Sequence, residues 1–223
     1  MPTALITGAA RCLGLEFTRQ FAAKGYAVHA CARAPDSLRG ETGDIHRHRL
    51  EVTDYKAVQA LAKELAGEAI DVLICNAGIA GREAGELGRI DPAVWRQTFE
   101  VNTLAPLVMA EAFVEHVARS QQKKLVAVSS RLGSITHNDG SRYAYRASKT
   151  ALNMEWKSLS KDTAGRGVIC VVMHPGWVQT DMGGGAAPLT IADSVPAMVK
   201  VIDGLKRSDN GRFINYDGSE IPW

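Results

Sequence analysis

Short apolar runs alternate with longer segments of helical periodicity along the whole chain. Within residues 13–24, apolar side chains recur at Leu13, Phe17 and Phe21, which is the spacing of one helix face. The apolar runs predict strands at residues 4–7, 26–32, 45–52, 71–75, 124–129, 168–174 and 212–215. The periodic segments predict helices at residues 13–24, 55–66, 92–119, 143–163 and 191–207.

The alternation of strands and helices indicates the fold class. Runs that are apolar at consecutive positions, such as residues 168–174, are typical of strands buried on both faces of a parallel sheet. We therefore expect an α/β fold, with one doubly wound parallel sheet flanked by helices on both faces. No linker, shift in composition or internal repeat divides the sequence, so residues 1–223 are expected to form a single domain.

Composition excludes several classes of protein. The chain is 46% hydrophobic and 22% charged, which is typical of soluble globular domains and argues against disorder. A net charge of +2 does not favour binding to nucleic acid or to an anionic membrane. The longest apolar run, residues 104–110, is far shorter than the roughly 18 residues of a membrane span. The N-terminal residues lack the basic region of a signal peptide.

The cysteine pattern predicts neither a metal site nor a disulfide framework. None of the four cysteines forms a CxxC pair, and no histidine lies at ligand spacing from any of them. Three of them, Cys31, Cys75 and Cys170, lie in apolar runs, where a free thiol packs as a small hydrophobic group. We expect no bound metal and a reduced, cytoplasmic protein.

A glycine-rich turn, TGAARCLG at residues 7–14, follows the first predicted strand and opens the first helix. At this junction of a doubly wound fold, backbone N–H groups and the helix N-terminus face the pyrophosphate of a dinucleotide. Small side chains allow the backbone to approach the cofactor closely. We expect contacts to the cofactor from Gly8, Arg11, Cys12, Leu13 and Gly14. A turn of this composition can also be purely structural.

Tyr145 and Lys149 form a candidate catalytic pair. Positions i and i+4 lie on one face of the helix predicted for residues 143–163, so both side chains can reach a common site. A nearby ammonium favours the phenolate and should lower the pKa of Tyr145, which suits proton transfer near neutral pH. The other nearby tyrosine, Tyr143, has alanine at the position of the lysine. Tyr–Lys pairs at this spacing also occur by chance on solvated helix faces.

In their order along almost the whole chain, these motifs resemble those of the short-chain dehydrogenase/reductase family. The glycine turn follows the family pattern TGxxxGxG, except that Cys12 replaces the middle glycine. Residues 145–149 match its YxxxK motif, residues 75–78 (CNAG) resemble its NNAG element, and residues 175–180 its PGxxxT segment. Within the family, the end of the chain and residues 174–182 are most similar to C-factor/sniffer-type carbonyl reductases.

The resemblance implies a Rossmann-type fold and assigns roles to particular residues. Tyr145 would be the general acid/base, Lys149 its partner, and Asn102 the helix residue that maintains a proton relay. The serine that contacts the substrate would be Ser130, two residues further from the tyrosine than is usual, with Ser134 as the alternative. Beyond the glycine turn, the resemblance implies cofactor contacts from Asn76, Ala77, Gly78, Tyr145, Lys149, Pro175, Gly176, Val178 and Thr180.

The end of the second predicted strand bears on the choice between NADP(H) and NAD(H). The family's NAD-selective acidic residue is replaced by Ala32, and Arg33 follows it. Together with Arg11, Arg33 could hold the 2′-phosphate of NADP(H), which is the cofactor we expect. Asp36 would favour NAD(H) instead if the strand ended later. Glu51 and Val52 would lie near the adenine by the same resemblance.

Two functions follow from the resemblance. The first is an NADPH-dependent oxidoreductase that transfers hydride between the nicotinamide and a carbonyl or alcohol substrate. The second is a dinucleotide-binding sensor or signalling protein with little turnover. This alternative is supported by Cys12 and Cys75, which replace family residues at cofactor-facing motif positions. A homodimer or homotetramer is expected, with helices 92–119 and 143–163 at the interface. The short segment 183–190 suggests an open pocket for a small-molecule substrate.

Overall fold

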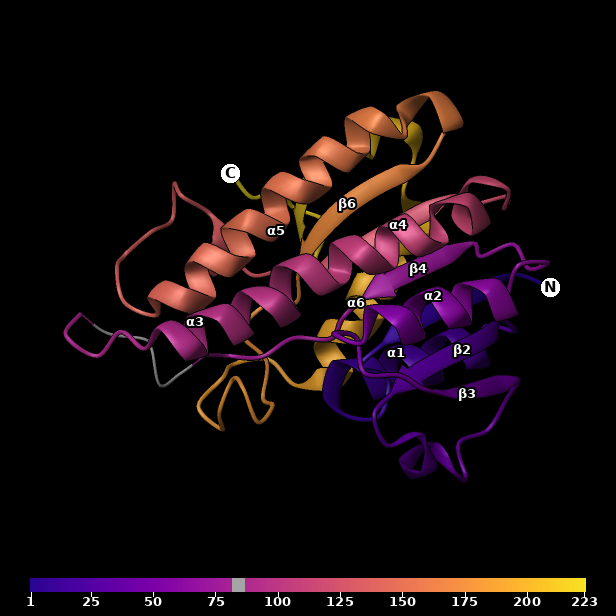
Figure 1. Cartoon of the computed structure of the whole chain (residues 1–223), viewed down its shortest axis with the longest axis horizontal. Coiled ribbons are helices and arrows are strands. Elements are labelled where there is room, and N and C mark those ends of the chain that lie inside the picture. The colour runs from indigo at the N-terminus through magenta and orange to yellow at the C-terminus, as the bar shows by residue number, and fades with distance from the viewer. Residues whose placement is uncertain (82–86) are drawn as a thin grey trace.

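The centre of the structure, a computed structural model that describes residues 1–81 and 87–223, is a seven-stranded sheet (Figure 1). All neighbouring strands pair in parallel, in the order β3-β2-β1-β4-β5-β6-β7. The strands are β1 Thr3–Thr7, β2 Ala27–Ala32, β3 Ile45–Arg49, β4 Val72–Cys75, β5 Lys124–Val128, β6 Ile169–His174 and β7 Phe213–Asn215. The predicted parallel α/β sheet is therefore confirmed.

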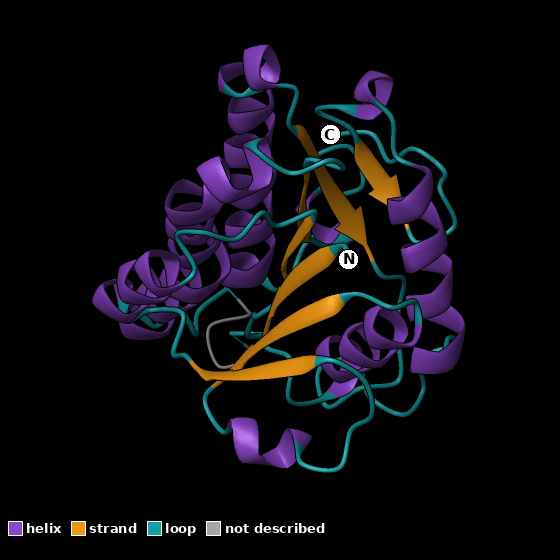
Figure 2. Ribbon diagram, turned by 90° about the vertical axis from the view of Figure 1, so that its right-hand side faces the viewer, coloured by secondary structure: helices purple, strands orange, loops and turns teal. Residues whose placement is uncertain are grey.

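Helices cover both faces of this sheet, as Figure 2 shows. They are α1 Cys12–Ala23, α2 Tyr55–Glu64, α3 Pro92–Phe99, α4 Ala105–Ala118, α5 Tyr143–Asp162 and α6 Ile191–Gly204. Side chains of α1 and α6 share one buried cluster with the sheet, and those of α2, α4 and α5 share a second on the opposite face. None of the described helices combines the length and apolar character that crossing a membrane would require.

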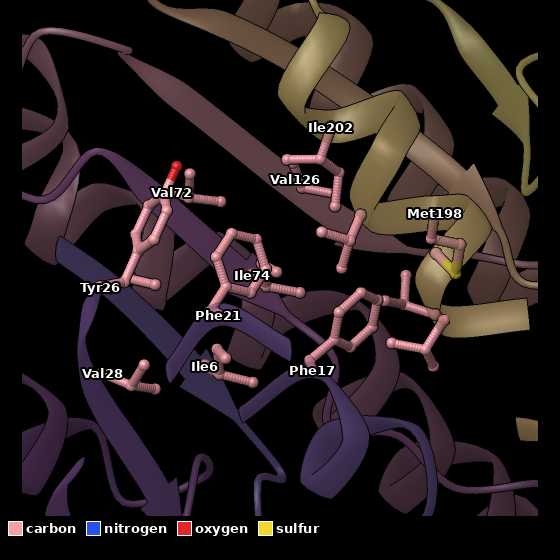
Figure 3. Packing of buried hydrophobic residues seen from close by; sticks show 14 of the residues in the cluster. Ile6, Phe17, Phe21, Tyr26, Val28, Val72, Ile74, Val126, Met198 and Ile202 are labelled. Carbon is pink, nitrogen blue, oxygen red and sulfur yellow. The ribbon is translucent and has the colours of Figure 1, made fainter. Parts of the chain in front are cut away.

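Alternate positions along each strand supply the two cores. In β1, Ile6 packs with Phe17 and Phe21 of α1, as Figure 3 shows, whereas its neighbour Leu5 belongs to the cluster on the other face. Both strand residues are fully buried. Burial of consecutive residues explains why the strands are apolar without alternation. Phe113 is fully buried in the second cluster.

The strand order reverses direction between β1 and β4. From β1 the chain builds outward through β2 to β3, and it then returns to place β4 on the other side of β1. In open α/β sheets, ligands bind at this switch point, outside the carboxyl ends of the strands. The loops that follow β1, β4, β5 and β6 therefore all lie at one edge of the sheet and are available to form a site.

Several element boundaries differ from the predicted ones. β3 ends at Arg49 rather than at residue 52, because this edge strand carries polar, partly exposed side chains and pairs only with β2. The helix expected at 92–119 is interrupted by a π-helical turn, Glu100–Leu104, between α3 and α4. Short 3-10 helices at Pro35–Leu38 and Arg131–Gly133 were not predicted.

Candidate active site

A cleft of about 1450 Å³ opens beside residues that end or follow β5, β6 and β7. Its walls come from the loop after β5, the first turns of α5 and the segment after β6. The predicted site residues that line it are Leu13, Ser130, Tyr145, Pro175, Gly176, Val178 and Thr180. Residues that are far apart in the sequence thus meet in one cavity, as expected from the parallel topology.

Tyr145 lies in the first turn of α5, with its side chain partly buried. Loss of water around its hydroxyl raises its pKa, while a hydrogen bond from Ser130 and the positive charge of Arg142 act in the opposite direction. The expectation that Lys149 lowers the pKa of Tyr145 is therefore wrong. Desolvation outweighs the nearby charges, and the cation that acts on the phenol is Arg142.

Ser130 follows β5 directly and caps the 3-10 turn Arg131–Gly133. Its Oγ accepts a hydrogen bond of 3.1 Å from the Leu132 N–H, and its side chain lines the cleft with Tyr145, whose pKa it lowers. Ser134 is buried and instead donates to the Pro222 carbonyl at 2.6 Å. The geometry therefore places Ser130, and not the alternative Ser134, beside the tyrosine.

Lys149 and Asn102 lie behind this wall. The Lys149 Nζ donates to the Val128 carbonyl at 2.9 Å, and burial lowers the pKa of the ammonium to about 8. Asn102, in the π-helical turn, accepts from the Ile79 N–H at 2.8 Å and donates to the Ile79 carbonyl at 2.9 Å. Between them, a Cβ on Gly78 would lie 3.2 Å from the Asn102 Oδ1 and 3.6 Å from the Lys149 Nζ.

The glycine turn after β1 is held by the loop after β4. The Asn76 Nδ2 donates to the Thr7 carbonyl at 2.9 Å, and the N–H groups of Asn76 and Ala77 donate to the Thr7 hydroxyl. Gly8 takes a φ of +67°, and a Cβ on Gly14 would lie 2.1 Å from the Gly8 carbonyl oxygen. Both positions therefore require glycine.

Cys12 begins α1 with a φ of +47°, in the left-handed region that favours glycine. This is the position at which the chain departs from the glycine pattern, so the backbone keeps a glycine-like conformation although a side chain is present. The thiol is partly exposed, whereas the three other cysteines are buried. Cys12 is thus the most accessible of the four cysteines.

The predicted phosphate clamp consists of two exposed arginines that face carboxylates. Arg11 pairs with Asp181 at 2.6 Å, and Arg33 lies 3.7 Å from Glu51. β2 ends at Ala32, as predicted, and Asp36 belongs to the following 3-10 helix. The alternative in which Asp36 ends the strand is therefore wrong.

The remaining predicted contacts occupy different environments. Val52 is buried, with 8% of its surface exposed. Gly176 takes a φ of +83°, and a Cβ there would lie 2.3 Å from the Leu189 Cδ1. The Thr180 Oγ1 accepts from the Gly183 N–H at 3.0 Å, which fixes the segment that follows β6. Val178 is buried in the same segment.

The cleft also contains basic residues that the sequence analysis did not select. Arg131, Arg142, Arg146 and His174 all line it. Arg142 and Arg146 are one helical turn apart and flank Tyr145, a spacing that could have identified them. Burial lowers the pKa of His174 to about 4, with a further contribution from Arg131, so this imidazole is neutral at physiological pH.

Comparisons with known proteins agree with the fold and the motifs. A family model described as short chain dehydrogenase matches residues 2–188. C-signal of Myxococcus xanthus is 44% identical over 167 residues, which are 74% of this chain and 100% of that protein. The carbonyl reductase Sniffer of D. melanogaster is 32% identical, with a TM-score of 0.92 and 100% of both chains covered. NADPH-bound carbonyl reductase from chicken fatty liver is 32% identical, with a TM-score of 0.91, covering 100% of this chain and 99% of that chain.

Proposed function

Since this chain belongs to the short-chain dehydrogenase/reductase family, we propose that it is an NADPH-dependent reductase of small carbonyl compounds. Its similarity to C-factor/sniffer-type proteins, expected from the sequence, is confirmed by the relatives above. The proposal rests above all on the cleft that Ser130 and Tyr145 line together. A substrate bound there can reach a proton donor and a second hydroxyl at the same time.

The turn after β1 fits the pyrophosphate of a dinucleotide. Gly8 and Gly14 leave room that any side chain would fill, as the Cβ distance at Gly14 shows. We place the adenosine 2′-phosphate at Arg11 and Arg33, because a phosphate can replace the exposed carboxylates that face them. The NADPH in the chicken reductase supports this choice, and Ala32 offers no carboxylate that would select NAD(H).

When bound, NADPH would supply the hydride that is added to the carbonyl carbon. Tyr145 would donate its phenolic proton to the carbonyl oxygen, so the product is an alcohol that has gained one hydride and one proton. The raised pKa of Tyr145 keeps the phenol protonated at neutral pH, as an acid requires. Ser130 would hydrogen-bond the same oxygen and orient it toward the tyrosine.

Lys149 and Asn102 would return a proton to Tyr145 after each turnover. A Lys149 pKa of about 8 allows this ammonium to release and accept protons near neutral pH. Asn102 holds the backbone of Ile79 and lies across Gly78 from the lysine. We assign it the task of maintaining the proton relay between Lys149 and solvent. Ser130 and Tyr145 line the cleft, and Lys149 and Asn102 lie behind its wall, an arrangement that favours turnover over the sensor alternative.

We also propose that the protein is cytoplasmic and assembles as a homodimer or homotetramer. The four free cysteines are consistent with a reducing compartment. Leu104, in the π-helical turn, and Met154 of α5 are 41% and 67% exposed, so the long helices carry apolar surface. Sedimentation equilibrium tests the assembly, and a monomer at micromolar concentration would contradict it.

Steady-state oxidation of NADPH across a panel of aldehydes, ketones and quinones tests the function. We expect turnover of at least one class, and a loss of about 10²- to 10⁴-fold in Tyr145→Phe with NADPH binding retained. Tyr143→Phe is the matched control, since it removes a neighbouring exposed phenol. Tight NADPH binding without turnover of any compound would support the sensor instead.

A further inference from the structure

The guanidinium of Arg146 is buried beside the proposed catalytic tyrosine. Only 8% of the residue is exposed, and it lines the same cleft as Tyr145. Its Nη2 donates to the Asp139 carboxylate, whereas Nε and Nη1 have no hydrogen-bond partner among the residues that the structure describes. Buried donors without partners are unfavourable, and more so in a cation, so Arg146 favours the approach of an anion.

The ion pair with Asp139 compensates for only part of the free-energy cost of burying the Arg146 guanidinium. Its side chain is 81% exposed, so water competes with Arg146 for the carboxylate. Burial lowers the pKa of Arg146, which is the direction expected for a cation that has lost water without gaining an equivalent partner. Two nitrogens of this guanidinium, Nε and Nη1, therefore remain buried without a hydrogen-bond partner after the ion pair with Asp139 has formed.

The surrounding cleft has an excess of positive charge. Arg142, which immediately precedes α5, is four residues before Arg146, and Arg131 follows β5; both line the cleft. Within residues 1–81 and 87–223, neither Arg142 nor Arg131 forms an ion pair with a carboxylate. The acidic residue Glu220 also lines the cleft, but it pairs with Arg212 at 3.1 Å.

We propose that Arg146, together with Arg142, forms a subsite for a carboxylate carried by the carbonyl substrate. This inference rests on the reductase function proposed above and adds the substrate class: an aldehyde or ketone that also bears a carboxylate. Arg142 would attract the carboxylate at the mouth of the cleft, and Arg146 would donate to it from the buried wall. Because Arg142, Arg146 and Tyr145 all line the cleft, a carboxylate held by the arginines would direct the carbonyl end toward the proton donor.

The test compares two aldehydes that differ only at the carboxyl group, the anion 4-formylbenzoate and its uncharged methyl ester. Reduction of each is followed by NADPH oxidation, and kcat and KM are measured separately. We expect kcat/KM to favour the carboxylate by about 10- to 100-fold, mainly through KM. Arg146→Gln should reduce this preference at least 10-fold, and Arg146→Lys should restore part of it. Arg119→Gln, which removes an exposed arginine from the end of α4, should leave the preference unchanged.

Arg142→Gln keeps the test decisive if Arg146→Gln does not fold, because Arg142 is exposed. Its effect on the pKa of Tyr145 acts on both substrates alike, so a lower preference for the carboxylate isolates the subsite. Binding of 4-(hydroxymethyl)benzoate and of its methyl ester is also measured by calorimetry with NADP⁺ present, in the Tyr145→Phe variant so that the alcohol is not oxidised. Equal affinity for acid and ester overturns the subsite. Tighter binding of the acid without reduction of either aldehyde supports the subsite and refutes the reductase.

Discussion

Replacement of Glu155 by glutamine should stabilise the protein at alkaline pH. Glu155 is a partly buried residue of α5, and its Oε2 has no hydrogen-bond partner among the described residues. Burial raises the pKa of this carboxyl from 4.5 to about 7. Because the folded state retains the proton that the unfolded chain releases, stability is greatest near and below pH 4.5 and falls as the pH rises through about 7.

The size of the effect follows from the two pKa values. The change from 4.5 to about 7 corresponds to at most about 3.4 kcal/mol against the ionised form. Since the side chain is only partly buried, solvent screens part of this penalty, and we expect about 1–2 kcal/mol. Glutamine keeps the shape of the carboxyl without its charge.

Urea denaturation at pH 5 and pH 8 measures the difference. Glu155→Gln should raise the free energy of unfolding by about 1–2 kcal/mol at pH 8 and by much less at pH 5. Glu111→Gln, at an exposed position of α4, is the control and should change stability little at either pH. Equal changes at both pH values, or a loss of stability at pH 8, would show that the carboxylate is not the source of strain.

Three further substitutions or modifications test the cofactor site. Arg33→Ala should weaken NADPH binding about 10- to 100-fold and leave NADH binding nearly unaffected. Unchanged affinity for both cofactors would refute the proposed phosphate clamp. Gly14→Ala should lower stability by about 1–3 kcal/mol because its Cβ meets the Gly8 carbonyl, whereas Gly67→Ala meets nothing within 4 Å. Iodoacetamide should modify Cys12 first, since the other cysteines are buried with raised pKa values, and NADPH should slow it. If NADPH does not change the rate at which Cys12 is labelled, Cys12 lies outside the cofactor site.

Much of the fold could be predicted because local pattern and tertiary burial agree. Residues 168–174 are apolar at successive positions, and β6 there is buried on both faces. The boundary of β3 was harder, because pairing with β2 alone decides where an edge strand of polar residues ends. The π-helical turn around Asn102 follows from contacts with Ile79, more than twenty positions earlier in the chain, which no local spacing reports.

The chemistry of the site was less predictable than its residues. The spacing of Tyr145 and Lys149 identifies a pair on one helix face, but the pKa of the phenol depends on how much water reaches it. The choice between Ser130 and Ser134 depends on the path of a loop, and the structure decides it through the contact of Ser134 with Pro222. The burial of Arg146 could not be predicted, because in the sequence it resembles any charged residue on the exposed face of a helix.

The sheet order also governs when the parts of the site become available as the chain is synthesised. β1 is synthesised first, but the amide of Asn76 that holds its glycine turn lies 68 positions beyond Gly8. The cleft wall at Asn215 comes much later still, when β7 adds to the edge of β6. Because contacts between distant segments form slowly, the edge of the sheet that carries the cleft is complete only after β6 and β7 have joined it, and the cleft is among the last parts of the fold to close.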